Sequence, residues 1–61
     1  MDTGALKARI AKVMREEETH PRACPDLLIY LADLFNACDF ATTAADLADI
    51  AAEFESIERA A

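Results

Sequence analysis

Apolar residues recur at helical spacing in three separate stretches of this chain, and this pattern restricts the fold more than any other feature. In the first stretch the apolar side chains lie three or four residues apart on one stripe, as in an amphipathic helix. The stripe consists of Leu6, Ile10, Val13 and Met14. Asp2 or Thr3 is positioned to cap its N-terminus, and Pro21 ends it because the residue before a proline disfavours helical geometry.

The second stretch begins at Pro25, which suits the first turn of a helix because its missing N–H would have no partner there. Apolar side chains cover most of the circumference of this segment and leave one polar face. They are Leu27, Leu28, Ile29, Tyr30, Leu31, Leu34 and Phe35, and the polar face carries Asp26, Asp33 and Asn36. We therefore expect the second helix to be the most buried element, with Phe40 in the connection that follows it.

A third helix is indicated by Thr43 and, three residues later, Asp46, which together have the form of a capping box. One apolar stripe then continues almost to the C-terminus through Leu47, Ile50, Ala51, Phe54 and Ile57. The sequence thus predicts an all-α protein, a compact three-helix bundle with helices at about 4–19, 25–39 and 43–60 in a single domain covering residues 1–61. A chain of 61 residues is marginal for an isolated hydrophobic core, so a monomer and a homodimer both stay open.

Charge is distributed unevenly along the chain, which has 12 acidic and 6 basic residues and a net charge of -6. Residues 1–22 are nearly neutral, whereas residues 23–61 contain eight acidic residues and a single basic one, Arg59. Direct binding to nucleic acid is therefore disfavoured, since phosphates would be repelled. With no apolar stretch of about 18 residues and no apolar leader at the N-terminus, we expect a cytoplasmic protein that does not enter a membrane.

The residues that usually carry chemistry are sparse. Cys24 and Cys38 bracket the second helix, about 21 Å apart at 1.5 Å per residue, so we expect two reduced thiols rather than a disulfide. His20 is the only histidine, which leaves too few ligands for a zinc site, and the single Gly4 excludes a phosphate-binding loop. We expect no catalytic residue, metal or cofactor.

Acidic residues at helical spacing are the candidates for function. Asp46, Asp49 and Glu53 form a row along one edge of the third helix, with steps of roughly 5–6 Å, where a DNA-reading helix would need basic or amide side chains. Asp26 and Asp33 share a face of the second helix, and Glu16 and Glu17 lie at the end of the first. The alternative is that these charges only keep the protein in solution. Tyr30 and Phe40 are expected at the margin of the core, with binding anchors as the alternative.

The chain resembles the small, acidic, helical anti-CRISPR proteins of phages and mobile elements in size, alanine content and carboxylate-covered surface, including the row Asp46, Asp49 and Glu53. The resemblance covers the whole chain by general character and includes no diagnostic motif. It implies a protein partner with a basic surface, a subunit of a Cascade-type complex, whose recognition of target DNA would be blocked by mimicry of DNA charge. The alternative is a homodimeric helical regulator or antitoxin-like module that pairs through the apolar faces of helices one and three.

Overall fold

Three helices account for nearly all of the residues that the structure, a computed structural model, describes, namely residues 2–60. They are α1 (Thr3–Thr19), α2 (Pro25–Phe40) and α3 (Ala44–Ala60). The prediction of an all-α three-helix bundle is confirmed, and every predicted boundary lies within one residue of the observed one. Phe40 is the last residue of α2 rather than part of the following connection.

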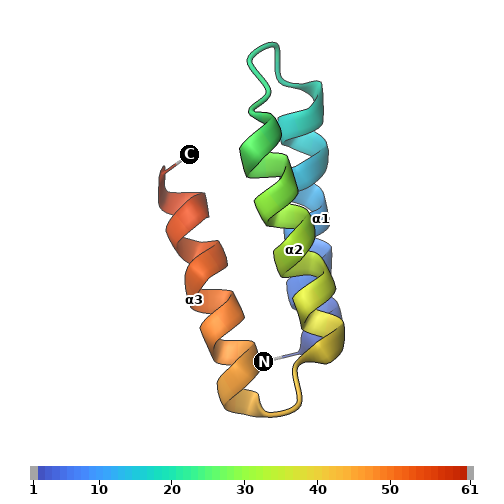
Figure 1. The fold of residues 1–61 in the computed structure, drawn as a ribbon, viewed down its shortest axis with the longest axis vertical. Coiled ribbons are helices and arrows are strands. Elements are labelled where there is room, and N and C mark those ends of the chain that lie inside the picture. Colours follow the sequence, from blue (N-terminus) through green and yellow to red (C-terminus); the bar gives the residue numbers. More distant parts are fainter. Residues whose placement is uncertain (1, 61) are drawn as a thin grey trace.

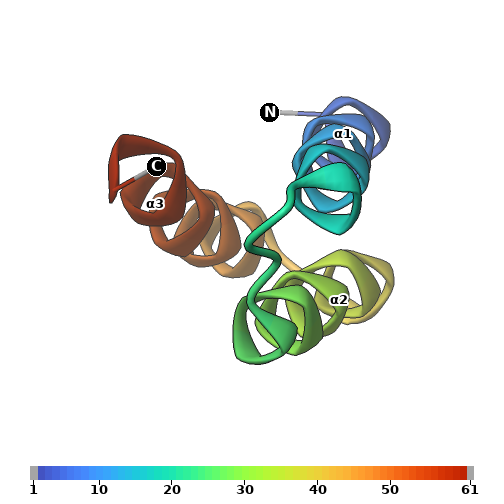
Figure 2. The same cartoon turned by 90° about the horizontal axis from the view of Figure 1, so that it is seen from above.

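The helices run alternately up and down (Figure 1). α1 and α2 form the closest pair, and α3 packs more against α2 than against α1. Seen from above, α3 lies to one side of the pair, near it at its beginning and diverging toward its C-terminal end (Figure 2). At this diverging end lies an open hollow, lined by Glu17, His20, Leu27, Ile57 and Ala60.

The core forms where the three apolar stripes meet, as the periodicity predicts. Its buried members are Leu6, Ile10, Leu31, Leu34, Cys38, Leu47, Ala51 and Phe54. Among residues 2–60 no polar or charged side chain is buried, so the core is formed by van der Waals packing of aliphatic side chains around Phe54. Because α1 and α3 use their apolar stripes here, a homodimer would need a different face from the one proposed on sequence grounds.

Side chains cap two of the three helix beginnings. The carboxylate of Asp2 accepts from the N–H of Gly4 at 3.2 Å, which satisfies one of the free donors of α1. The N–H of Asp46 donates to Thr43 Oγ1 at 3.0 Å, so the predicted cap of α3 is present. At α2 the N-cap residue is Cys24, without a side-chain cap, and Pro25 follows in the first turn.

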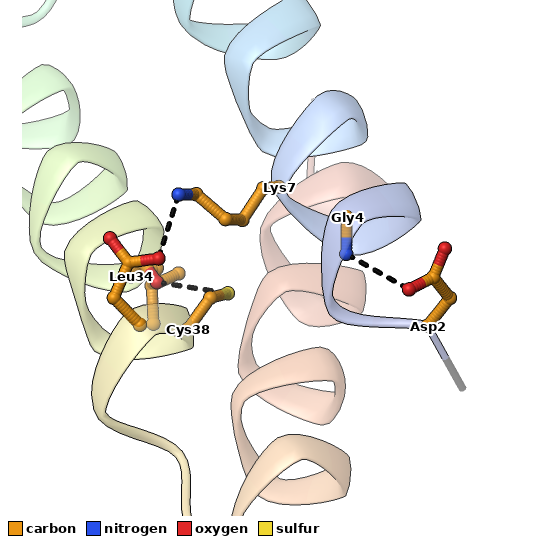
Figure 3. A network of polar contacts seen from close by, with 6 residues as sticks. Asp2, Gly4, Lys7, Leu34 and Cys38 are labelled. Carbon is orange, nitrogen blue, oxygen red and sulfur yellow. Dashed lines mark hydrogen bonds and ion pairs between the residues drawn. The ribbon is translucent and has the colours of Figure 1, made fainter.

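Two cations of α1 tie it to its neighbours. Lys7 Nζ lies 2.8 Å from a carboxylate oxygen of Asp39 on α2 and 4.6 Å from the centre of the Phe35 ring. Figure 3 shows Lys7 reaching across to α2 above Cys38, whose thiol donates to the carbonyl of Leu34. Arg9 makes the corresponding contact to α3, where it pairs with Glu58. The cations of the nearly neutral first segment thus compensate part of the acidic excess of the later ones.

The expectation that α2 is the most buried of the three helices is confirmed, but the apolar residues on its outer side lie in solvent. Ile29 is 62% exposed and Phe40 is 81% exposed. A helix in a three-helix bundle packs against only two neighbours, so apolar residues around its whole circumference leave some in solvent. The placement of Phe40 at the core margin is wrong for the same reason, whereas Tyr30, 41% exposed, does lie at the margin.

Candidate functional site

A hydrogen bond between α2 and α3 shows which of their edges face one another. The hydroxyl of Tyr30 donates to Glu53 Oε2 at 2.6 Å. Residues three or four positions apart share a helix face, so Asp26 and Asp33 lie on the same side of α2 as Tyr30. By the same spacing, Asp49 lies beside Glu53 on α3.

Five of the seven carboxylates predicted to bind a partner therefore occupy one edge of the molecule. We call it the acidic edge, and all five of its residues are exposed. It consists of Asp26 and Asp33 on α2 and Asp46, Asp49 and Glu53 on α3. Because α2 and α3 are antiparallel and Tyr30 contacts Glu53, Asp33 and Asp49 lie at about the same level along the two helices (Figure 1). No lysine or arginine occurs in residues 23–58, so neither helix supplies a neighbouring cation along this edge.

Asp46 has a structural role as well. One carboxylate oxygen accepts from the hydroxyl of Thr42 at 2.9 Å and from its N–H at 3.3 Å. The N–H of Asp46 in turn donates to the hydroxyl of Thr43. This arrangement resembles a capping box, except that the carboxylate reaches back to Thr42, one residue before the N-cap residue Thr43. The hydrogen bonds from Thr42 and Thr43 favour the ionised form and lower the pKa of Asp46. Its charge therefore also serves to start α3.

Glu53 is also engaged within the molecule, through Tyr30. The hydrogen bond stabilises the neutral phenol, and with partial desolvation and the negative charge of Glu53 it raises the pKa of Tyr30. This contact joins the two halves of the acidic edge.

Asp33 and Asp49, unlike Asp46 and Glu53, have no polar partner within the described structure. Within residues 2–60 neither carboxylate makes a hydrogen bond or an ion pair. Asp26 lies in the first turn of α2, where the helix dipole favours a negative charge. Asp33 and Asp49 lie in helix interiors, with no such compensation. Of the five carboxylates of the acidic edge, these two therefore make no contact that would explain their charge by a role in folding.

Glu16 and Glu17 are not part of the acidic edge. They belong to the last turn of α1, and Glu17 Oε1 accepts from the N–H of Cys24 at 3.1 Å. This contact explains a carboxylate at the negative end of α1, because the same carboxylate lies against the positive end of α2. Glu17 is half-buried and Glu16 is exposed. Spacing could have revealed the role of Glu17, which lies four residues after Val13 and so continues the core stripe.

The remaining cations of α1 lie elsewhere. Lys12 and Arg15 are exposed, and both lie away from the core positions Leu6 and Ile10 on the helix. The outer side of α1 therefore carries mixed charge, since the exposed carboxylates Glu16 and Glu18 lie one turn after Lys12 and Arg15, whereas the acidic edge carries carboxylates alone.

Apolar side chains lie beside the acidic edge, and of these Phe40 was considered as an anchor on sequence grounds whereas Ile29 was not. Ile29 lies three residues after Asp26 and four before Asp33, and Phe40 lies seven after Asp33. Both therefore share the outer face of α2 with these carboxylates. Its spacing to the two aspartates is the signal that could have placed Ile29 on the polar side of the helix.

Other sites of chemistry are few in the described part of the chain. Cys24 and Cys38 are both free, the first exposed and the second buried. Burial raises the pKa of the Cys38 thiol, and nearby Lys7 opposes the rise. Residues 2–60 contain no cluster of three His, Cys, Asp or Glu side chains that would hold a metal ion. None of their helices is long and apolar enough to cross a bilayer.

Comparison with known proteins gives no relative: no protein family, no curated protein and no solved structure matches this chain.

Proposed function

We propose that this protein is a non-catalytic inhibitor that acts in the bacterial cytoplasm by occupying a basic, nucleic-acid-binding surface of another protein. The acidic edge is the observation that carries the proposal. Its five carboxylates lie on two adjacent helices, and the segment from residue 23 to 58 contains no cation. Such an edge attracts a groove lined by lysine and arginine and repels nucleic acid itself.

Binding alone is sufficient for this activity. Carboxylates on successive helical turns are about 5–6 Å apart, a spacing similar to that of phosphates along one strand. The edge presents this charge without bases or sugars, so it competes for phosphate-binding side chains without being read for sequence. Association is then fast and sensitive to salt, and the lifetime of the complex depends on the apolar contacts beside the charges.

The target class that we propose is a DNA-contacting subunit of a Cascade-type CRISPR effector. Small size, all-helical architecture and a carboxylate-covered surface are the features shared with anti-CRISPR proteins of this kind. Blocking such a subunit prevents recognition of target DNA, which the effector's basic surfaces otherwise hold by its backbone.

The test is a competition experiment with a panel of purified Cascade-type complexes and their cognate labelled duplexes. We expect DNA binding by a susceptible complex to be lost at an equimolar amount of the protein. Asp33→Lys and Asp49→Lys should each weaken inhibition by about tenfold or more, since close charge pairs at interfaces couple by at least about 1.5 kcal/mol.

Glu18→Lys is the matched control, because it makes the same change of charge at an exposed residue beside Phe35, on the α1 side of α2. It should inhibit as well as the unchanged protein. Failure to inhibit any complex in the panel would refute the proposed target. Equal effects of all three reversals would show that only net charge matters and would refute a role for the acidic edge.

A further inference from the structure

The outer face of α2 carries a regular stripe of exposed residues. Asp26, Ile29, Asp33, Asn36 and Phe40 follow one another at spacings of 3, 4, 3 and 4, all exposed to solvent. This is the spacing by which one helix presents a seam to another. The stripe is about 21 Å long at 1.5 Å per residue, long enough to seat four turns of a second helix.

Two features distinguish this stripe from an ordinary solvated face. Ile29 and Phe40 are among the most exposed large apolar side chains of the described chain, at 62% and 81%. Each lies within one turn of a polar stripe residue, Ile29 between Asp26 and Asp33 and Phe40 after Asn36. A docking helix would therefore meet Ile29 between two carboxylates and then, past the neutral Asn36, the ring of Phe40, all along one line.

A second copy of the chain does not match this stripe. In a two-fold pairing of two α2 faces, the middle residue Asp33 would lie against its own copy, and α2 has no lysine or arginine to neutralise the pair. The exposed outer side of α1 offers cations in Lys12 and Arg15, but its neighbours there include Ala8 rather than large apolar side chains. Neither face would bury Ile29 and Phe40 against apolar partners.

We propose that the stripe docks an amphipathic basic helix of the partner protein, with apolar side chains against Ile29 and Phe40 and with lysine or arginine beside Asp26 and Asp33. This inference deepens the proposed function, on which it rests for the identity of the partner. Charge complementarity selects the basic helix and sets its register, while the two apolar side chains slow its release. The α3 carboxylates of the acidic edge then contact cations of the partner that flank the docked helix.

The probe for this proposal is a synthetic helical peptide of about 20 residues, with leucine at alternating spacings of three and four and arginine at the flanking positions. Binding of the labelled peptide is followed by fluorescence anisotropy, and its location by amide chemical shifts. We expect saturable binding that moves the amide signals of α2. Peptides with arginine replaced by glutamate, or leucine by serine, should bind at least about tenfold more weakly.

The decisive variant is the double substitution Ile29→Ser and Phe40→Ser. Its matched control is Ala48→Ser with Ala52→Ser, which introduces two serines at exposed positions of α3. We expect Ile29→Ser with Phe40→Ser to weaken peptide binding by about tenfold or more, and the alanine double variant to leave it unchanged. Both variants should be as helical as the unchanged protein by circular dichroism.

Several results would overturn the inference. Equal binding by the two double variants, or shifts confined to other helices, would show that the stripe is not the docking site. A dimer in sedimentation that dissociates on Ile29→Ser with Phe40→Ser would show that a second copy covers it. If that variant still inhibits an effector while Asp49→Lys does not, the stripe is refuted and the proposed function stands. If the peptide docks as expected but no effector is inhibited, the proposed function fails and the docking helix stands.

Discussion

The Tyr30 hydroxyl and the Glu53 carboxylate lie 2.6 Å apart and join α2 to α3 at the middle of both helices. α3 diverges from the other two helices toward its C-terminal end (Figure 2), and among residues 2–60 its polar contacts with them outside the core are this hydrogen bond and the ion pair of Arg9 with Glu58. The hydrogen bond also places the carboxylates of the two helices along one edge. The same contact thus serves the fold and arranges the surface that we propose binds a partner.

Ionisation of Tyr30 should therefore weaken the folded state. The contact raises the pKa of Tyr30 in the folded protein above its unfolded value of about 10. Its contribution to stability is fully present below that unfolded value and is lost as the pH rises through the folded pKa. Tyr30 is the only tyrosine and the chain has no tryptophan, so the ultraviolet absorbance of tyrosinate reports this single group. We expect a titration midpoint above 10.

Glu53→Ala removes the acceptor and should return the midpoint toward the value of a free tyrosine. Asp49→Ala is the control, since Asp49 lies on the same edge four residues earlier and makes no contact with Tyr30 in the structure. A midpoint that is the same in Glu53→Ala and in the unchanged protein would contradict the assigned cause.

Asp46 should make the stability of α3 sensitive to acid. Its pKa is lowered by the hydrogen bonds from Thr42 and Thr43, so its contribution is present above the unfolded value of about 3.9 and is lost as the pH falls through the folded pKa. Asp46→Asn removes the charge and should lower the melting temperature at neutral pH. At a pH well below the folded pKa the variant and the unchanged protein should melt at the same temperature.

Thermal unfolding followed by circular dichroism checks this prediction at both pH values. Asp33→Asn is the matched control, because Asp33 has no hydrogen-bond donor in the described structure. It should melt close to the unchanged protein at neutral pH. A melting difference for Asp46→Asn that persists in strong acid would show that its effect is not carried by the carboxylate charge.

The helices and their ends were predictable because their causes are local. Pro21 and Pro25 act through the geometry of adjacent residues, and Thr43 with Asp46 forms a cap within one turn. Each of these signals determines a helix end independently of the tertiary contacts made elsewhere in the chain. The apolar stripes likewise identified the core positions of α1 and α3, where a single stripe leaves no choice of buried face.

The arrangement of the surface depended on tertiary contacts that spacing does not contain. Spacing placed Asp26 with Asp33, and Asp49 with Glu53, but not the two sets along one edge. That depends on which side of α2 faces α3, which the contact between Tyr30 and Glu53 reveals. Ile29 was misplaced because α2 has more apolar residues than its two neighbours cover.

The two isoleucines Ile10 and Ile29 provide a direct test of this difference between core and surface. Both lie within helices, but Ile10 is 0% exposed and Ile29 is 62% exposed. Ile10→Val removes a methyl group from the packed core and should lower the free energy of unfolding by about 0.5–1.5 kcal/mol. Ile29→Val removes the same group and has the same cost in helix propensity, yet it should change stability by less than about 0.5 kcal/mol, because the methyl group already lies in water. Urea unfolding followed by circular dichroism measures both values. Since the chemical change is identical, an equal loss in the two variants would mean that Ile29 is covered in solution, as it would be in a dimer formed through the outer face of α2.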